Sequence, residues 1–174
     1  MFRAPVFREP LAVTPELLPE VLADHLDRLY RAAWALTGSR EDAEDLVQET
    51  FARVLAKPRR IEGDDPMPYL LRVLRNTFFS SLRTRGRRPQ TRPLEPDEAL
   101  AIAPESASPP AIAATREVFA AIAALSDEHR DVLVAVDVAG LTYEETAAAF
   151  DLPLGTVMSR LYRARGKAAE ALRA

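Results

Sequence analysis

The last fifth of the sequence carries the side chains that point most clearly to a chemistry. Within nine residues lie several hydrogen-bond donors and cations: Ser159, Arg160, Tyr162, Arg163, Arg165 and Lys167. Donors of this kind read base edges in the major groove of DNA, and cations bind its phosphates. Residues one helical turn apart share a face, so these groups face outward if Val157, Leu161 and Ala164 pack inward. The pattern predicts a DNA-reading helix.

The segment before this helix predicts how it is positioned. Thr142 and Glu145 have the spacing of a helix-starting capping box. Asp151 to Gly155 reads as a tight turn, and the basic helix then runs from about Thr156 to Leu172. A helix, a tight turn and a basic helix are the outline of a helix-turn-helix.

Charge is sorted into blocks along the chain, although the net charge is only -3. Residues 57–93 carry 10 basic and 3 acidic side chains, and residues 152–174 carry 5 basic and 1 acidic. The rest of the chain is acidic. Basic stripes are typical of phosphate-binding surfaces, whereas solvated helix faces usually mix both signs. Two separate contacts with nucleic acid are therefore expected.

The remaining elements are also predicted to be helices, so the fold class is all-α. A first helix ends at Gly38, a second follows Ser39 to about Ala56, and a third begins near Met67 and ends in the basic tail 83–88. We expect two small helical domains: a lead over 1–19, a domain over 20–90, a flexible proline-rich linker over 91–112, and the helix-turn-helix domain over 113–174. The arrangement of the two domains is left open.

The composition argues against several other kinds of protein. The chain has no cysteine, its histidines are only His25 and His129, and it has no glycine-rich phosphate loop. We therefore expect no catalytic residues, no cofactor and no metal site. No apolar run approaches the roughly 20 residues of a spanning helix, so a cytoplasmic protein is expected.

Three strings resemble segments of the extracytoplasmic-function sigma factors of bacterial RNA polymerase. Pro153-Leu-Gly-Thr-Val-Met-Ser-Arg-Leu-Tyr-Arg-Ala-Arg, with Leu141-Thr-Tyr-Glu-Glu-Thr-Ala before it, is similar to region 4 of that family. Leu36-Thr-Gly-Ser-Arg-Glu-Asp-Ala-Glu-Asp-Leu-Val-Gln-Glu-Thr-Phe resembles the polymerase-binding part of region 2. The resemblance implies three partners: core RNA polymerase, through the clamp of its largest subunit and the flap of its second-largest subunit; promoter DNA; and an anti-sigma factor. The acidic linker is an alternative means of covering the basic faces.

The resemblance also implies roles for individual residues. Polymerase binding falls on Asp45, Gln48 and Glu49. Reading of the minus-ten element falls on Asn76, with its neighbours Arg75, Thr77, Phe79, Ser80 and Arg83, next to a melting segment over 60–68. At the minus-thirty-five element Met158, Ser159, Tyr162 and Arg163 address bases, and Arg160 and Arg165 are phosphate contacts or internal braces. Tyr69, Ser80 and Met158 depart from the usual family residues.

Three other functions fit parts of the sequence. A sigma-like decoy that binds an anti-sigma factor without driving transcription should lose the basic recognition helix, and this chain keeps it. A plain helix-turn-helix repressor leaves the basic block over 57–93 without a role. An enzyme lacks a candidate active site: Glu144 and Glu145 fit a helix start better than an acid–base pair, and His129 fits packing better than catalysis.

Overall fold

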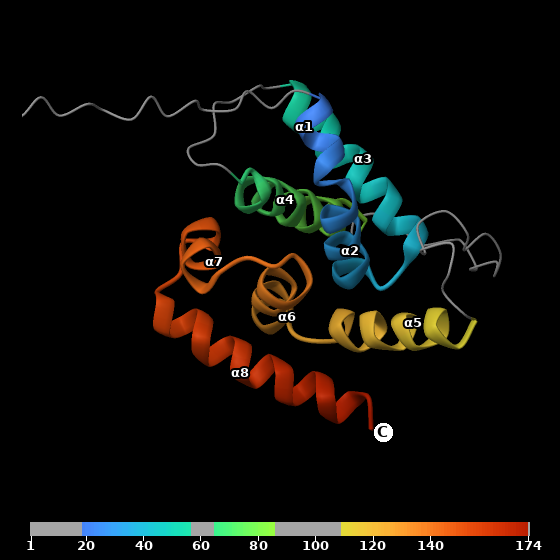
Figure 1. The fold of residues 1–174 in the computed structure, drawn as a ribbon, viewed down its shortest axis with the longest axis vertical. Coiled ribbons are helices and arrows are strands. Elements are labelled where there is room, and N and C mark those ends of the chain that lie inside the picture. Colours follow the sequence, from blue (N-terminus) through green and yellow to red (C-terminus); the bar gives the residue numbers. More distant parts are fainter. Residues whose placement is uncertain (1–18, 57–64, 86–108, 174) are drawn as a thin grey trace, which may run out of the picture.

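The structure is a computed structural model that describes residues 19–56, 65–85 and 109–173. Every regular element among these residues is a helix, which confirms the all-α prediction (Figure 1). The predicted N-terminal lead, most of the predicted melting segment and most of the predicted linker lie outside the described residues.

The N-terminal domain consists of α1 (Pro19–Asp24), α2 (Leu26–Thr37), α3 (Arg40–Ala56) and α4 (Met67–Arg85), and α2 packs against both α3 and α4. Gly38 ends α2 as predicted: its φ is 73°, and its N–H donates to the carbonyl of Trp34 over 2.8 Å. A left-handed residue at this position favours glycine. The turn at Gly38 sets α3 alongside α2.

Three details of this domain differ from the sequence analysis. The first helix is two helices, because His25, with φ -103° and ψ -1°, separates α1 from α2. Leu55 and Leu82 continue the apolar helical spacing of α3 and α4, which predicts that they face the core, but both are exposed. Phe78 fills the inward position on α4 instead of Leu82. The exposed leucines lie near the C-terminal ends of their helices, where the apolar pattern runs past the packed region.

The C-terminal domain consists of α5 (Pro109–Ala123), α6 (Asp127–Leu133), the π-helix η1 (Val134–Val138), α7 (Tyr143–Phe150) and α8 (Leu154–Ala171). α5 begins within the segment predicted as linker. The helix that follows Ser126 changes to π geometry at Val134, so the N–H of Ala139 reaches back to the Val134 carbonyl over 2.8 Å. Sequence periodicity does not reveal one such wide turn.

The helix-turn-helix is confirmed. Thr142 caps α7 with the predicted capping box: its hydroxyl accepts from the Glu145 N–H over 3.1 Å, and its own N–H donates to the Glu145 carboxylate over 2.8 Å. Asp151 ends α7 in the left-handed region, with φ 54°, and turns the chain into α8. These local bonds fix the direction in which α8 leaves the domain.

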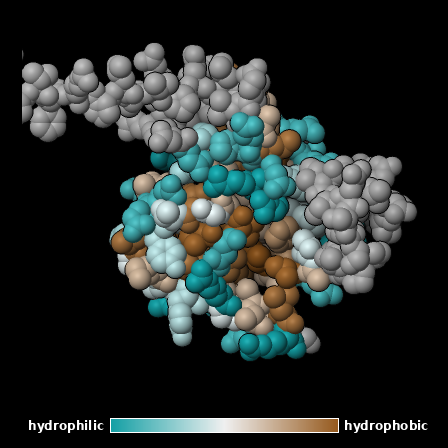
Figure 2. Space-filling view, in the orientation of Figure 1, coloured by the Kyte–Doolittle hydropathy of each residue, from teal (hydrophilic) through white to brown (hydrophobic). Residues whose placement is uncertain are grey.

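The two domains share one hydrophobic core. α2 packs against α5 and η1, and α4 packs against α7. Buried side chains from both domains form a single cluster that includes Trp34, Phe78, Phe119, Ile122 and Leu133. Figure 2 shows hydrophobic surface at the middle of one face, where the two domains meet, surrounded by hydrophilic side chains. The structure thus supplies the domain arrangement that the sequence left open.

Candidate nucleic-acid interface

The outer face of α8 carries side chains that protrude into solvent. Its inner face is Val157, Leu161 and Ala164, all buried as predicted. Tyr162 is 81% exposed and Met158 is 52% exposed, and Ser159 and Arg163 are exposed beside them. Their spacing of three and four residues gathers them on one face of the helix. The four residues predicted to address bases therefore lie together.

Two arginines of α8 are held by acidic residues of the same domain. Arg165 donates from Nε and Nη2 to the two carboxylate oxygens of Asp137, over 2.9 and 2.6 Å. Arg160 lies 3.2 Å from the Glu128 carboxylate. The hydrogen bonds from Arg165 to Asp137 raise the pKa of its guanidinium, so it stays charged. Both arginines occupy the brace positions that the resemblance offered as one alternative.

α4 presents the second predicted DNA-reading set, with one correction. Asn76 and Arg83 are exposed, and Phe79 and Ser80 are half-buried. Thr77 is 0% exposed, and its hydroxyl donates to the Val73 carbonyl over 2.9 Å. A side chain without accessible surface does not reach a base, so Thr77 belongs to the packed face of α4.

Arg75 points from α4 across to the C-terminal domain. Its Nε donates to the Asp131 carboxylate over 2.5 Å, and its guanidinium lies 4.8 Å from the ring centre of Phe79 and 5.2 Å from that of Phe150. This predicted DNA contact is therefore engaged by α6 and α7 in the structure.

The predicted polymerase-binding residues lie on the outside of α3. Asp45, Gln48 and Glu49 are exposed, and the opposite face of the helix, with Leu46 and Val47, is buried. Glu49 pairs with Arg53 one turn later on the same helix, over 2.5 Å. A pair this exposed contributes little to stability, so it leaves the acidic face available to a partner.

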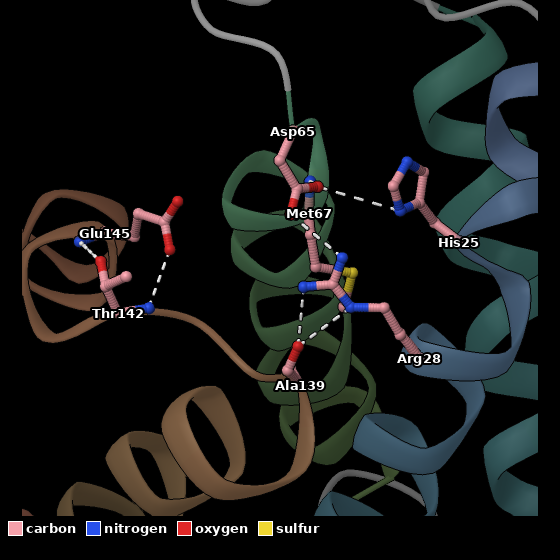
Figure 3. A network of polar contacts seen from close by, with 7 residues as sticks. All are labelled: His25, Arg28, Asp65, Met67, Ala139, Thr142 and Glu145. Carbon is pink, nitrogen blue, oxygen red and sulfur yellow. Dashed lines mark hydrogen bonds and ion pairs between the residues drawn. The ribbon is translucent and has the colours of Figure 1, made fainter.

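The polar contacts between the domains were not predicted from the sequence. Arg28 of α2 donates from Nε and Nη2 to the carbonyl of Ala139, over 3.1 and 2.9 Å, and from Nη1 to Asp65 over 3.0 Å (Figure 3). We call this set of bonds the Arg28 fork. Asp65 also accepts from the Met67 N–H over 2.8 Å at the start of α4, and His25 lies 3.8 Å from it. A main-chain acceptor has no signature in a sequence.

The sequence does contain an indication that Asp131 has a buried partner. It stands directly before Val132, Leu133 and Val134, and an acidic residue at the start of a buried run usually has a partner. It is 4% exposed, and burial raises the pKa of its carboxyl group despite the opposing effect of Arg75.

Among the described residues, no three His, Asp or Glu side chains cluster in a way that would hold a metal ion. None of the described helices is long and apolar enough to cross a membrane.

The comparison with protein families agrees with both halves of the structure. Residues 21–88 match sigma-70 region 2, and residues 115–167 match sigma-70 region 4. The helical N-terminal domain and the helix-turn-helix thus define a chain of the sigma-70 class.

Individual relatives show to which family within the sigma-70 class the chain belongs. The chain is 37% identical over 151 residues to the ECF RNA polymerase sigma factor SigE of Mycolicibacterium smegmatis, covering 84% of this chain and 58% of SigE. It is 33% identical to EcfG of Rhodopseudomonas palustris, covering 90% of this chain and 85% of EcfG. The sigma factor RpoE of Bartonella quintana, in complex with the anti-sigma factor NepR, aligns with a TM-score of 0.67 and 26% identity over 90% of this chain and 98% of RpoE. This chain belongs to the family of ECF RNA polymerase sigma factors.

Proposed function

We propose that the chain binds bacterial core RNA polymerase and directs it to particular promoters, without contributing a catalytic group of its own. A protein with this role works in the cytoplasm, where the polymerase and the chromosome are. The observation that carries the proposal is the outer face of α8, where Met158, Ser159, Tyr162 and Arg163 protrude from a helix-turn-helix. This is the geometry in which a recognition helix enters the major groove.

At the minus-thirty-five element the side chains on the outer face of α8 have different roles. Arg163 supplies donors for base edges, and Met158 and Tyr162 supply apolar surface. Ser159 donates its hydroxyl to the Thr156 carbonyl over 3.1 Å, which leaves its oxygen as an acceptor for a base edge. Arg163 and Lys167 form no ion pair with any residue that the structure describes, so their charges are available to DNA. Arg160 and Arg165 hold α8 to the rest of its domain through their ion pairs with Glu128 and Asp137. They contact phosphates only at the edge of the proposed DNA contact.

At the minus-ten element the residues of α4 make the contacts with DNA. Opening a promoter requires single-stranded bases to leave the stack and to be held by stacking and hydrogen bonds, with phosphates bound nearby. Asn76 has the amide for base recognition, Phe79 and Ser80 lie beside it, and Arg83 and Arg75 supply charge. Thr77 is left out of this set because it is buried.

The acidic face of α3, with Asp45, Gln48 and Glu49, is our candidate for the contact with the clamp of the largest polymerase subunit. The C-terminal domain is the candidate for the flap of the second-largest subunit. An anti-sigma factor is a further proposed partner, because the structurally similar RpoE was solved in complex with one.

Run-off transcription with bacterial core polymerase and a promoter library tests the proposal. Core polymerase with this chain should give transcripts with defined starts, and neither component should do so alone. The Asn76→Ala, Arg163→Ala double variant should lose most of this product. Arg116→Ala is the matched control, because Arg116 is an exposed arginine on α5 that belongs to neither proposed DNA-reading set.

Two results would contradict the proposal. Transcripts that are unchanged in the double variant would remove both DNA-reading assignments. Binding to core polymerase or to an anti-sigma factor, with no transcript from any promoter, would favour the decoy function instead.

A further inference from the structure

One buried titratable side chain lies close to the proposed recognition helix and takes no part in the contacts proposed above. His129 of α6 is 5% exposed, and α6 packs against α8 (Figure 1). Its neighbour Glu128 lies 3.2 Å from Arg160 of α8, so an ion pair joins the two helices directly beside the ring. A change in the charge of His129 is therefore felt by the helix that carries the proposed base contacts.

The two ring nitrogens of His129 have different surroundings. Nδ1 lies 2.6 Å from the hydroxyl of Ser126, the residue that precedes α6. A hydroxyl can donate or accept, so this hydrogen bond is compatible with both the neutral and the protonated ring. Nε2 is buried and has no hydrogen-bond partner among the residues that the structure describes. The protonated ring therefore has one buried N–H without an acceptor, which is unfavourable.

The charges around the ring also oppose its protonation. Burial is the first cause that lowers the pKa of His129. Three cations of α8 lower it further, with Glu128 as the opposing charge: Lys167, Arg163 and Arg160. His129 also lies in the first turn of α6, at the positive end of the helix dipole. In the free protein the ring is therefore mostly neutral at pH 7.

The cations that act on His129 lie where the proposed complex brings negative charge. Phosphates flank a recognition helix in the major groove. Arg163 and Lys167 form no ion pair with any residue in the described part of the chain, so phosphates are their available counter-charges. A phosphate near α8 offsets the repulsion that these cations exert on a protonated ring. Protonation of His129 is therefore less unfavourable in the complex than in the free protein.

We propose that His129 couples DNA binding by α8 to the uptake of one proton, so that the affinity for DNA rises as the pH falls. The proton comes from the solvent and returns to it when the complex dissociates. This coupling rests on the proposed function, because it requires α8 to bind DNA.

Thermodynamic linkage determines the direction of the effect. If DNA makes the ring easier to protonate, protonation strengthens DNA binding by the same factor. The affinity does not change with pH while the ring is neutral in both the free protein and the complex. It rises as the pH falls into the range where only the bound ring is protonated, and it becomes constant again below the lowered pKa of the free protein. One ring limits the rise to at most about tenfold per pH unit.

The folding stability of the free protein responds to acid in the opposite direction. Because the pKa of His129 is lowered in the folded state, acid favours the unfolded chain. A purely structural role of the ring would therefore weaken DNA binding in acid, along with the fold. Stronger DNA binding at a pH that lowers stability distinguishes the coupling from such a role.

Fluorescence anisotropy with a short random-sequence DNA duplex, between pH 7.5 and 5.5, tests the coupling. A random sequence suffices because the phosphate charges, which are the same in every sequence, cause the effect. The affinity of the unchanged protein should rise several-fold as the pH falls, and His129→Gln should remove this rise. His25→Gln is the matched control, because His25 is the only other histidine of the chain. Added salt should reduce the rise, since it screens the phosphates.

NMR of the histidine ring protons gives a second readout that needs no change at His129. The pKa of His129 should be higher in the duplex-bound protein than in the free protein, and His25→Gln assigns the two ring signals. Circular dichroism at each pH should show that the helices of all three proteins are intact.

The outcomes separate this coupling from the proposed function. Affinity that decreases or stays constant as the pH falls, or a rise that persists in His129→Gln, would overturn the coupling and leave DNA binding intact. An unchanged pKa of His129 on duplex binding would overturn it as well. Absence of duplex binding at every pH would refute DNA binding by α8, and the coupling with it.

Discussion

The indole ring of Trp34 in α2 meets the ring of Phe119 in α5 edge to face, with centroids 4.8 Å apart and planes at 75°. Both side chains are buried. Trp34 is the only tryptophan of the chain, so its fluorescence reports on a contact between the two domains without any label.

Phe119→Ala should weaken this contact and be visible in the emission of Trp34. Truncation of a buried phenylalanine typically costs about 3–5 kcal/mol. We expect a red-shifted emission maximum, because Trp34 gains contact with water, and a lower denaturation midpoint in urea. Val118→Ala is the control, since Val118 on the same helix is 38% exposed and should change both quantities much less. An unshifted maximum in Phe119→Ala would mean that the rings do not meet in solution.

The apolar side chains on the outer face of α8 predict a preference for thymine. The 5-methyl group of thymine is the apolar feature of the major groove, and Met158 and Tyr162 protrude toward the groove in the proposed complex. Replacing a contacted thymine in the minus-thirty-five element by deoxyuridine should weaken binding several-fold, or about 1 kcal/mol for one methyl group. In Met158→Ala the same replacement should have little further effect. Thymines outside the element serve as controls in a mobility-shift assay.

Asp137 should restrain the binding of DNA by α8. Its carboxylate holds Arg165 through two hydrogen bonds, so Asp137→Asn frees a positive charge beside the proposed groove contact. Affinity for promoter duplex should rise, and the slope of log K against log salt should steepen by up to about one unit. Arg165→Ala should abolish the difference between Asp137 and its asparagine variant. Identical salt slopes would show that Arg165 does not approach a phosphate.

Acid should destabilise the C-terminal domain through His129. The pKa of His129 is lowered from 6.5, first by burial and then by Lys167, Arg163 and Arg160, with Glu128 opposing. A base with a lowered pKa in the folded state binds protons more readily when unfolded, so its stability contribution is present above pH 6.5 and is lost as the pH falls below it. The melting temperature should decrease between pH 7.5 and 5.5. His129→Gln should flatten this decrease, and a parallel decrease in the variant would assign it to other groups.

The capping box of α7 should contribute measurably to stability. Thr142→Ala removes the bond to the Glu145 N–H at the start of the helix, and loss of such a cap costs about 1 kcal/mol. Urea denaturation followed by circular dichroism measures it. Glu144→Ala is the control, because Glu144 lies in the same turn without a capping bond. Equal midpoints in the two variants would show that the cap is dispensable.

Local features of this fold were predictable because they depend on neighbouring residues. Gly38, Thr142 and the turn at Asp151 each satisfy backbone groups within a few positions, and the inner face of α8 follows from helical spacing. The apolar pattern of α4 was less informative: it did not separate Leu82, which is exposed, from Phe78, which is buried. Periodicity identifies a helix face but not the length over which a partner covers it.

The relation between the domains was not predictable, since it depends on contacts between residues far apart in the chain. The Arg28 fork spans 111 positions to Ala139, and Arg75 reaches Asp131 over 56. The resemblance assigned Arg75 to DNA as a neighbour of Asn76, and the structure gives it an internal partner as well. The candidate DNA residues on α8 required no such long-range information, because all of them come from one helix.

In the C-terminal domain the acceptor of the Arg28 fork is the peptide oxygen of Ala139, and this gives the two sides of the fork an unequal sensitivity to mutation. Substituting the side chain at Ala139 leaves the carbonyl in place, whereas most changes at Arg28 remove the fork at once. The fork therefore depends on the identity of one side chain in α2, while in the C-terminal domain it depends on the position of the backbone at Ala139.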